Sequence, residues 1–151
     1  MREIKFRAWI IEAQIMVDVE YICFSEPEYS DEEYRGGYIV HTDISGPTPI
    51  TALEPNEPIC VTPLKNCKLM QFTGLHDKDG KEGYYKDITY DEELGEIHII
   101  EWDDEEALFY LKGFGGNCLG TKADDLQLSA LKERQIIGNI YENPELLEPT
   151  V

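Results

Sequence analysis

The chain of 151 residues lacks the features of a membrane or secreted protein. It has no apolar run that approaches the ~18 residues of a membrane span. Its charged, alternating beginning, Met1–Arg7, lacks the apolar centre of a signal peptide, so we expect a cytoplasmic protein. Hydrophobic residues make up 42% of the chain and aromatic residues 11%, which suffices for a buried core.

Basic residues are scarce. Lys and Arg number 13 against 31 Asp and Glu, which gives a formal net charge of −18. A protein that binds the phosphate backbone of nucleic acid needs a basic surface, and so does one that docks on an anionic membrane. We therefore expect no direct binding to nucleic acid and none to membranes.

Metal-binding and catalytic motifs are also missing. The four cysteines (Cys23, Cys60, Cys67 and Cys118) form no Cys-x-x-Cys pair, and no histidine lies at zinc-finger spacing from them. We expect free, buried thiols, no metal and no other cofactor. There is no Gly-x-Ser-x-Gly sequence, and the glycine-rich segment 113–120 lacks the third glycine of a dinucleotide fingerprint. We therefore expect a protein that is not an enzyme.

Alternating apolar residues and turn signals predict a mainly β fold. We expect a small barrel-like sheet of hairpins with an N-terminal β appendage. The predicted strands cover residues 4–10, 15–24, 37–41, 69–73, 84–90, 97–102, 107–111 and 135–141. Five prolines predict an extended connector over residues 46–63, and four glycines predict a loop over 113–120. Residues 126–131 suggest helical turns, and Asn143 and Pro144 predict a short C-terminal helix with an asparagine cap.

Three segments resemble the YopX family of phage and prophage proteins. They are MREIKFRAW at 1–9, LMQFTGLHDKDGKE at 69–82 and IGNIYENPELL at 137–147. The resemblance implies a single domain over residues 1–151. A subdivision into a β segment (1–45), a proline-rich connector (46–68) and a β-rich part (69–151) stays open.

The family resemblance implies a small β-rich protein of a phage that infects a bacterial host, and it carries over no catalytic residue. The segment Asp87-Ile88 is similar to the strand start of SH3-like barrels, which is an analogy of fold only. Lys86 stands where the family commonly has glycine. This change puts a tight turn at that position in question, because lysine tolerates a positive φ poorly.

The segment 91–106 is the strongest local anomaly, because it holds nine acidic residues and no Lys or Arg. A second run, between Arg7 and Arg35, has eight acidic residues and no basic one. Three interpretations stay open: a solvated surface, a face that attracts a basic partner, and a loose metal site. For the second, the candidate binding residues are Trp102, Asp103, Asp104, Glu105 and Glu106, with Trp9 as a further interface candidate.

For several other polar and aromatic residues, the sequence predicts a structural role. The sequence Asp77–Gly80 resembles a calcium loop, but Leu75 and Lys86 stand where such a loop needs acids, so a hairpin turn is predicted. His98 lies between two isoleucines, so it faces the polar side of its strand if they face the core, and a satisfied or exposed histidine is expected rather than a catalytic one. Phe109 and Phe114 are expected in the core.

Two hypotheses of function follow. In the first, a non-enzymatic phage accessory protein binds a basic host or phage protein through an acidic face. In the second, a homo-oligomeric structural or regulatory module uses its acidic surface for solubility only.

Overall fold

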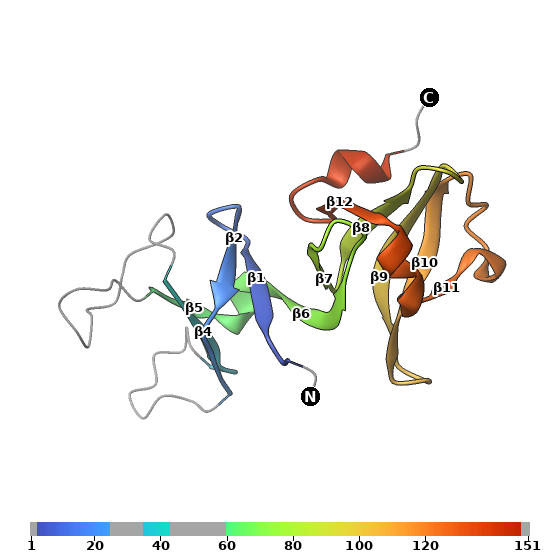
Figure 1. Cartoon of the computed structure of the whole chain (residues 1–151). Coiled ribbons are helices and arrows are strands. Elements are labelled where there is room, and N and C mark those ends of the chain that lie inside the picture. The colour runs from blue at the N-terminus through green and yellow to red at the C-terminus, as the bar shows by residue number, and fades with distance from the viewer. Residues whose placement is uncertain (1–2, 25–34, 43–59, 149–151) are drawn as a thin grey trace. The chain divides into compact units, whose positions relative to one another are not determined.

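The computed structural model describes residues 3–24, 35–42 and 60–148 (Figure 1). The chain divides into two compact units. We call them the N-terminal unit (Lys5–Met70) and the C-terminal unit (Gln71–Val151 with Met1–Ile4). Most of the proline-rich connector predicted over residues 46–63 lies outside the described residues.

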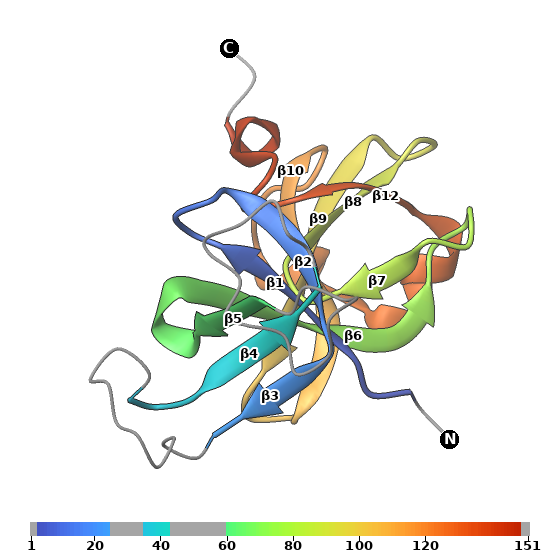
Figure 2. The same cartoon turned by 90° about the vertical axis from the view of Figure 1, so that its left-hand side faces the viewer.

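Two small sheets build the N-terminal unit. In the first, β1 (Phe6–Ile10) lies between β2 (Ile15–Val19) and β6 (Cys67–His76). In the second, the antiparallel strands are β3 (Tyr21–Cys23), β4 (Tyr38–His41) and β5 (Cys60–Pro63), shown in Figure 2. A one-turn helix, η2 (Leu64–Asn66), precedes β6. The core of this unit consists of Ala8, Ile10, Val17, Ile39 and Cys67.

A curled, five-stranded antiparallel sheet dominates the C-terminal unit (Figure 1). Its order is β11-β10-β9-β8-β12, with β8 at Asp87–Asp91, β9 at Glu96–Asp103, β10 at Leu108–Gly116, β11 at Leu126–Gln127 and β12 at Gln135–Asn139. The later part of β6 pairs with β7 (Glu82–Tyr84). The helices are η3 (Lys122–Asp124), η4 (Leu128–Glu133) and η5 (Pro144–Leu147). The core of this unit comprises Ile100, Phe109, Leu111, Leu131 and Ile136.

The prediction of a mainly β fold is confirmed. The C-terminal unit has the curled form of a half-barrel, and the helices within the described ranges are short 3-10 helices. The hairpin predicted at Asp79-Gly80 is present as β6–β7, and the one predicted over 97–111 is present as β9–β10. No helix in the described part of the chain is long and apolar enough to cross a membrane.

Two predicted strands are interrupted. The strand expected over 15–24 breaks at Glu20, whose backbone N–H donates to the carbonyl of Val40 at 2.9 Å as the chain leaves β2 for β3. The strand expected over 84–90 breaks at Tyr85 and Lys86, which form a turn between β7 and β8. In both places the apolar composition is that of a strand, and tertiary hydrogen bonding decides where pairing stops.

The loop predicted over 113–120 is wrong for its first half, because β10 continues to Gly116. A Cβ at Gly113 would collide with Asp124, so glycine here permits close packing rather than a loop. The Gly113 N–H also donates to Oδ1 of Asp125 at 3.1 Å, which holds the strand against the η3 segment.

Three further expectations need correction. Cys60–Pro63 is an edge strand (β5) rather than connector, which agrees with the tolerance of proline at sheet edges. Phe109 is buried as expected, but Phe114 is 41% exposed. The C-terminal helix is present as η5, yet the Asn143 side chain does not cap it; its Oδ1 accepts from the Asn139 N–H at 3.4 Å instead.

Candidate functional site

The predicted residues 102–106 belong to the tip of the β9–β10 hairpin, residues Trp102–Leu108. Oδ1 of Asp103 accepts hydrogen bonds from the backbone N–H groups of Glu105 (2.8 Å) and Glu106 (3.0 Å). Such a side-chain turn fixes the loop backbone, and Ala107 completes it with a φ of 53°. Asp104, Glu105 and Glu106 are exposed, so three carboxylates face solvent from an ordered turn.

Each face of this hairpin carries a partly exposed apolar side chain. Trp102 pairs with Phe109 across the strands, and their rings meet edge to face with centroids 4.9 Å apart, at the border of the core. Asp103 pairs with Leu108 on the opposite face. Trp102 is 40% exposed and Leu108 is 45% exposed. The tip therefore offers one apolar side chain on each face beside its carboxylates.

The acidic run 91–106 does not form one patch. Because β8, β9 and β10 are antiparallel neighbours, Asp91–Glu96 and Asp103–Glu106 lie at opposite ends of β9. At the first end, Arg134 lies 3.5 Å from Asp91 and 3.2 Å from Glu96. In the described part of the chain, no ion pair involves residues 103–106. Within the run 91–106, the tip is therefore the place where four consecutive acids form no ion pair with a described residue.

Trp9 belongs to β1 of the N-terminal unit, where it pairs with Met16. Its neighbours Ala8 and Ile10 are buried and Trp9 is half-buried, so it lies on the opposite face of the strand. The second acidic run falls in the same unit, and its residues 26–33 lie outside the described ones.

A buried polar cluster that the sequence did not predict lies in the C-terminal unit. Arg134 is only 3% exposed, and its guanidinium contacts the carboxylates of Glu96 and Asp91. Nη1 of Arg134 lies 3.3 Å from Nδ1 of His98, which is fully buried. Glu96 and His98 are two residues apart on one face of β9, but Arg134 follows 36 residues after His98, so no sequence signal joins them.

The protonation of His98 follows from its neighbours. Arginine only donates hydrogen bonds, so Nδ1 of His98 must accept from Arg134. Nε2 then carries the proton and donates to the carbonyl of Asp124 at 3.0 Å. Burial, together with the Arg134 charge, lowers the pKa of His98. His98 is thus neutral, buried and hydrogen-bonded, which agrees with the expectation of a satisfied histidine; it does not lie on an exposed face of the strand.

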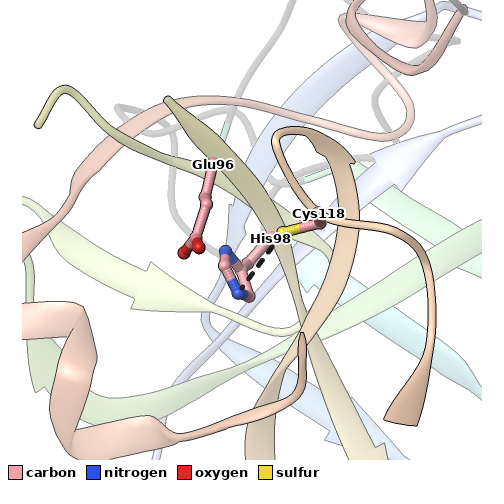
Figure 3. A group of neighbouring side chains, drawn as sticks. All are labelled: Glu96, His98 and Cys118. Atoms are coloured by element: carbon pink, nitrogen blue, oxygen red, sulfur yellow. Dashed lines mark hydrogen bonds between the residues drawn. The ribbon is translucent and has the colours of Figure 1, made fainter. Parts of the chain in front are cut away.

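Glu96, His98 and Cys118 are brought together, with one ligand atom of each within 4.8 Å of the others (Figure 3). These are donor types that zinc uses, but their state does not fit a metal. Nε2 of His98, 3.8 Å from the Cys118 sulfur, carries a proton that is already bonded to Asp124. The nearby Arg134 guanidinium repels a cation, and burial and Glu96 raise the pKa of the Cys118 thiol. A protonated thiol is also a poor nucleophile, so the cluster forms a closed hydrogen-bond network.

In segment 69–82, one of the three that resemble the YopX family, Asp77 holds a turn. Its buried carboxylate accepts hydrogen bonds through Oδ1 from the N–H groups of Asp79 and Lys81, both at 2.9 Å. Through Oδ2 it accepts from the N–H of Ile136 at 2.8 Å. The calcium-like sequence is thus a hairpin turn fastened to β12.

The family-like segment 137–147 also builds a turn. Oδ1 of Asn139 accepts from the N–H groups of Tyr141 and Glu142, both at 3.0 Å. A Cβ at position 138 would collide with the Asn143 side chain, which would have to shift, so glycine is favoured there. These residues serve the backbone and present no reactive group.

Lys86 adopts the backbone conformation that its chemistry disfavours, with a φ of 71°. Its N–H donates to the carbonyl of Ile100 at 2.8 Å, and its carbonyl accepts from Ile140 at 3.2 Å. Its ammonium lies 2.6 Å from Glu101 and 4.7 Å from the centre of the Tyr85 ring. Burial alone would lower the pKa of Lys86, but Glu101 raises it overall. The turn therefore persists without glycine, and side-chain contacts offset the backbone strain.

Comparison with known proteins places these features in context. The family model described as YopX protein matches residues 5–148. The chain is similar to the crystal structure of protein EF1440 from Enterococcus faecalis, with 22% identity, a TM-score of 0.56, and coverage of 98% of this chain and 100% of the other. It also matches the crystal structure of protein yopX from Bacillus subtilis, with 16% identity, a TM-score of 0.49, and coverage of 97% and 98%. No curated protein matches the chain.

Proposed function

This chain belongs to the YopX family, and we propose that it is a non-enzymatic accessory protein of a phage or prophage, acting in the host cytoplasm. It binds a basic macromolecular partner through the β9–β10 tip, which we define as residues Trp102–Leu108. One observation carries the proposal: four consecutive acids at 103–106, which form no ion pair within the described residues, stand between two exposed apolar side chains.

The tip suits a two-part mode of binding. Its carboxylates attract a basic surface over about 10 Å at 0.1 M salt, which raises the association rate and orients the partner. Trp102 and Leu108 then bury apolar area, and an aromatic anchor of this kind typically contributes about 2 kcal/mol or more to binding. Because the Asp103 carboxylate fixes the turn, little loop entropy is lost on binding.

Affinity capture from host lysate, followed by binding kinetics on the captured protein, tests the proposal. We expect a basic partner that is retained at low salt and lost at high salt. Replacing the four acids by Asn and Gln should slow association and flatten its salt dependence. Asp103→Asn keeps an oxygen for the turn. For a matched comparison, Glu105→Gln with Glu106→Gln removes two charges at the tip, and Glu92→Gln with Glu93→Gln removes two at the opposite end of β9. Equal effects of the two sets would contradict a specific tip.

A homo-oligomeric module is the second candidate. It is favoured by apolar side chains of the C-terminal unit outside the tip, because Leu94 is 54%, Phe114 41% and Leu119 85% exposed. Sedimentation at low micromolar concentration separates the two. A stable oligomer that survives high salt and replacement of the four acids would support the homo-oligomeric module. It would contradict a role of the acidic tip in binding.

A further inference from the structure

A groove of about 580 Å³ lies beside the acidic tip in the C-terminal unit. Asp103 and Leu108 line it, together with Tyr110 farther along β10, Leu126 of β11 and the preceding residue Asp125. Tyr110 pairs with Glu101 of β9 on one side and with Gln127 of β11 on the other. Its ring therefore lies on the sheet face opposite the core, flanked by a strand on each side.

Three carboxylates lie near this ring, in a groove that Lys112 and Lys122 also line. Burial raises the pKa of Tyr110, and the negative charges of Asp125, Glu101 and Asp103 raise it further. Glu101 is neutralised by Lys86, at 2.6 Å. The other two carboxylates are held by backbone N–H groups through Oδ1 alone, Asp103 from its own turn and Asp125 from Gly113. In the described part of the chain, Oδ2 of Asp103 and Oδ2 of Asp125 make no hydrogen bond or ion pair, so each presents an oxygen on a fixed side chain.

We propose that this groove binds an arginine side chain of the basic partner, with the guanidinium against Tyr110 and within reach of Asp103 and Asp125. A guanidinium is planar and weakly hydrated, stacks on aromatic rings, and donates to two carboxylates at once, whereas an ammonium is a hydrated point charge. Leu108 and Leu126 supply apolar surface for the methylene stem of the arginine.

The groove also limits what the partner can be. Lys112 and Lys122 line it as well, so a segment with many adjacent basic residues meets repulsion there. The groove therefore selects a single arginine in a segment that is otherwise neutral or acidic, while the exposed carboxylates of the tip attract the wider basic surface. This inference rests on the proposed function and names the side chain recognised.

The test titrates the full chain with the peptide acetyl-Gly-Arg-Gly-amide and follows amide resonances by two-dimensional NMR. We expect shifts centred on Leu108, Tyr110, Gly113 and Gln127. The lysine peptide should bind several-fold more weakly, and the uncharged citrulline peptide should not bind. Asp125→Asn keeps the acceptor for Gly113 and removes the charge, so it should weaken arginine binding about tenfold. Tyr110→Leu should have a similar effect.

Asp104→Asn is the control, because it removes the same charge from the tip but does not line the groove, and it should leave peptide affinity nearly unchanged. Equal affinity for the arginine and lysine peptides, shifts confined to the tip, or an Asp125→Asn variant that binds normally would each overturn the arginine assignment. If the basic partner still binds in a salt-dependent way in any of these cases, the proposed function stands and only the groove's role fails.

Discussion

The Asp77 carboxylate is expected to be one of the main polar supports of the C-terminal unit, and Asp77→Ala tests this. The variant removes three hydrogen bonds. The one from Ile136 is buried and charge-assisted, so its loss costs about 2 kcal/mol, and each turn bond adds about 1 kcal/mol. We therefore expect Asp77→Ala to lower the free energy of unfolding by about 4 kcal/mol.

Urea unfolding followed by tryptophan fluorescence measures this effect. A Trp9→Phe background leaves Trp102 as the reporter, which places the signal in the C-terminal unit that also contains Asp77. Asp77→Asn keeps one oxygen and should lose about half as much stability. Asp79→Ala is the matched control, because Asp79 is exposed in the same turn, and it should cost less than about 0.5 kcal/mol. Equal losses for Asp77→Ala and Asp79→Ala would refute the reasoning.

Three further predictions concern the C-terminal unit. At position 86, Lys86→Ala and Lys86→Gly both lose the Glu101 ion pair, but only glycine relieves the strain of the positive φ. The free energy of unfolding of Lys86→Gly should therefore be about 1 kcal/mol higher than that of Lys86→Ala. The reverse order in urea unfolding would contradict this. The pKa of His98 is lowered in the folded state, so the unfolded chain takes up a proton first as the pH falls below 6.5. In that range the free energy of unfolding should fall more steeply for the wild type than for His98→Gln. Parallel pH profiles of the two proteins would contradict this prediction. Gly138→Ala should cost about 2 kcal/mol through its collision with Asn143, and adding Asn143→Gly should recover part of that loss; additive losses would rule out this contact as the cause.

The hairpins could be predicted from sequence because their signals are local. The β9–β10 hairpin follows from alternation on both sides of a polar break, and the β6–β7 turn follows from Asp79-Gly80. The extension of β10 through Gly116 could not be predicted, because glycines usually indicate a loop and the reason for them here is the approach of Asp124. The strand break at Lys86 is hidden for a similar reason, since lysine does not signal a positive φ.

For the candidate sites too, one part could be predicted from the sequence and another could not. The acidic tip could be found from composition, because residues 103–106 are consecutive. The sequence could not tell that antiparallel pairing places the acids of 91–96 at the far end of β9, where Arg134 pairs with Asp91 and Glu96. Nor could it show the groove, because Asp125 reaches Tyr110 only through the pairing of β10 with β11.

The residues that carry the family resemblance are those that the fold uses for its turns. Asp77 fastens one hairpin to β12, Gly138 leaves room for Asn143, and Asn139 closes the turn after β12. Asp77 and Asn139 bind backbone groups and Gly138 makes room for a side chain, so the resemblance is explained by structure and does not locate a binding surface. The tip and the groove lie outside the three resembling segments, on a hairpin whose backbone would tolerate other side chains at the exposed positions. A partner specific to this protein is therefore to be sought at that hairpin, and the segments shared with the family should matter for stability first.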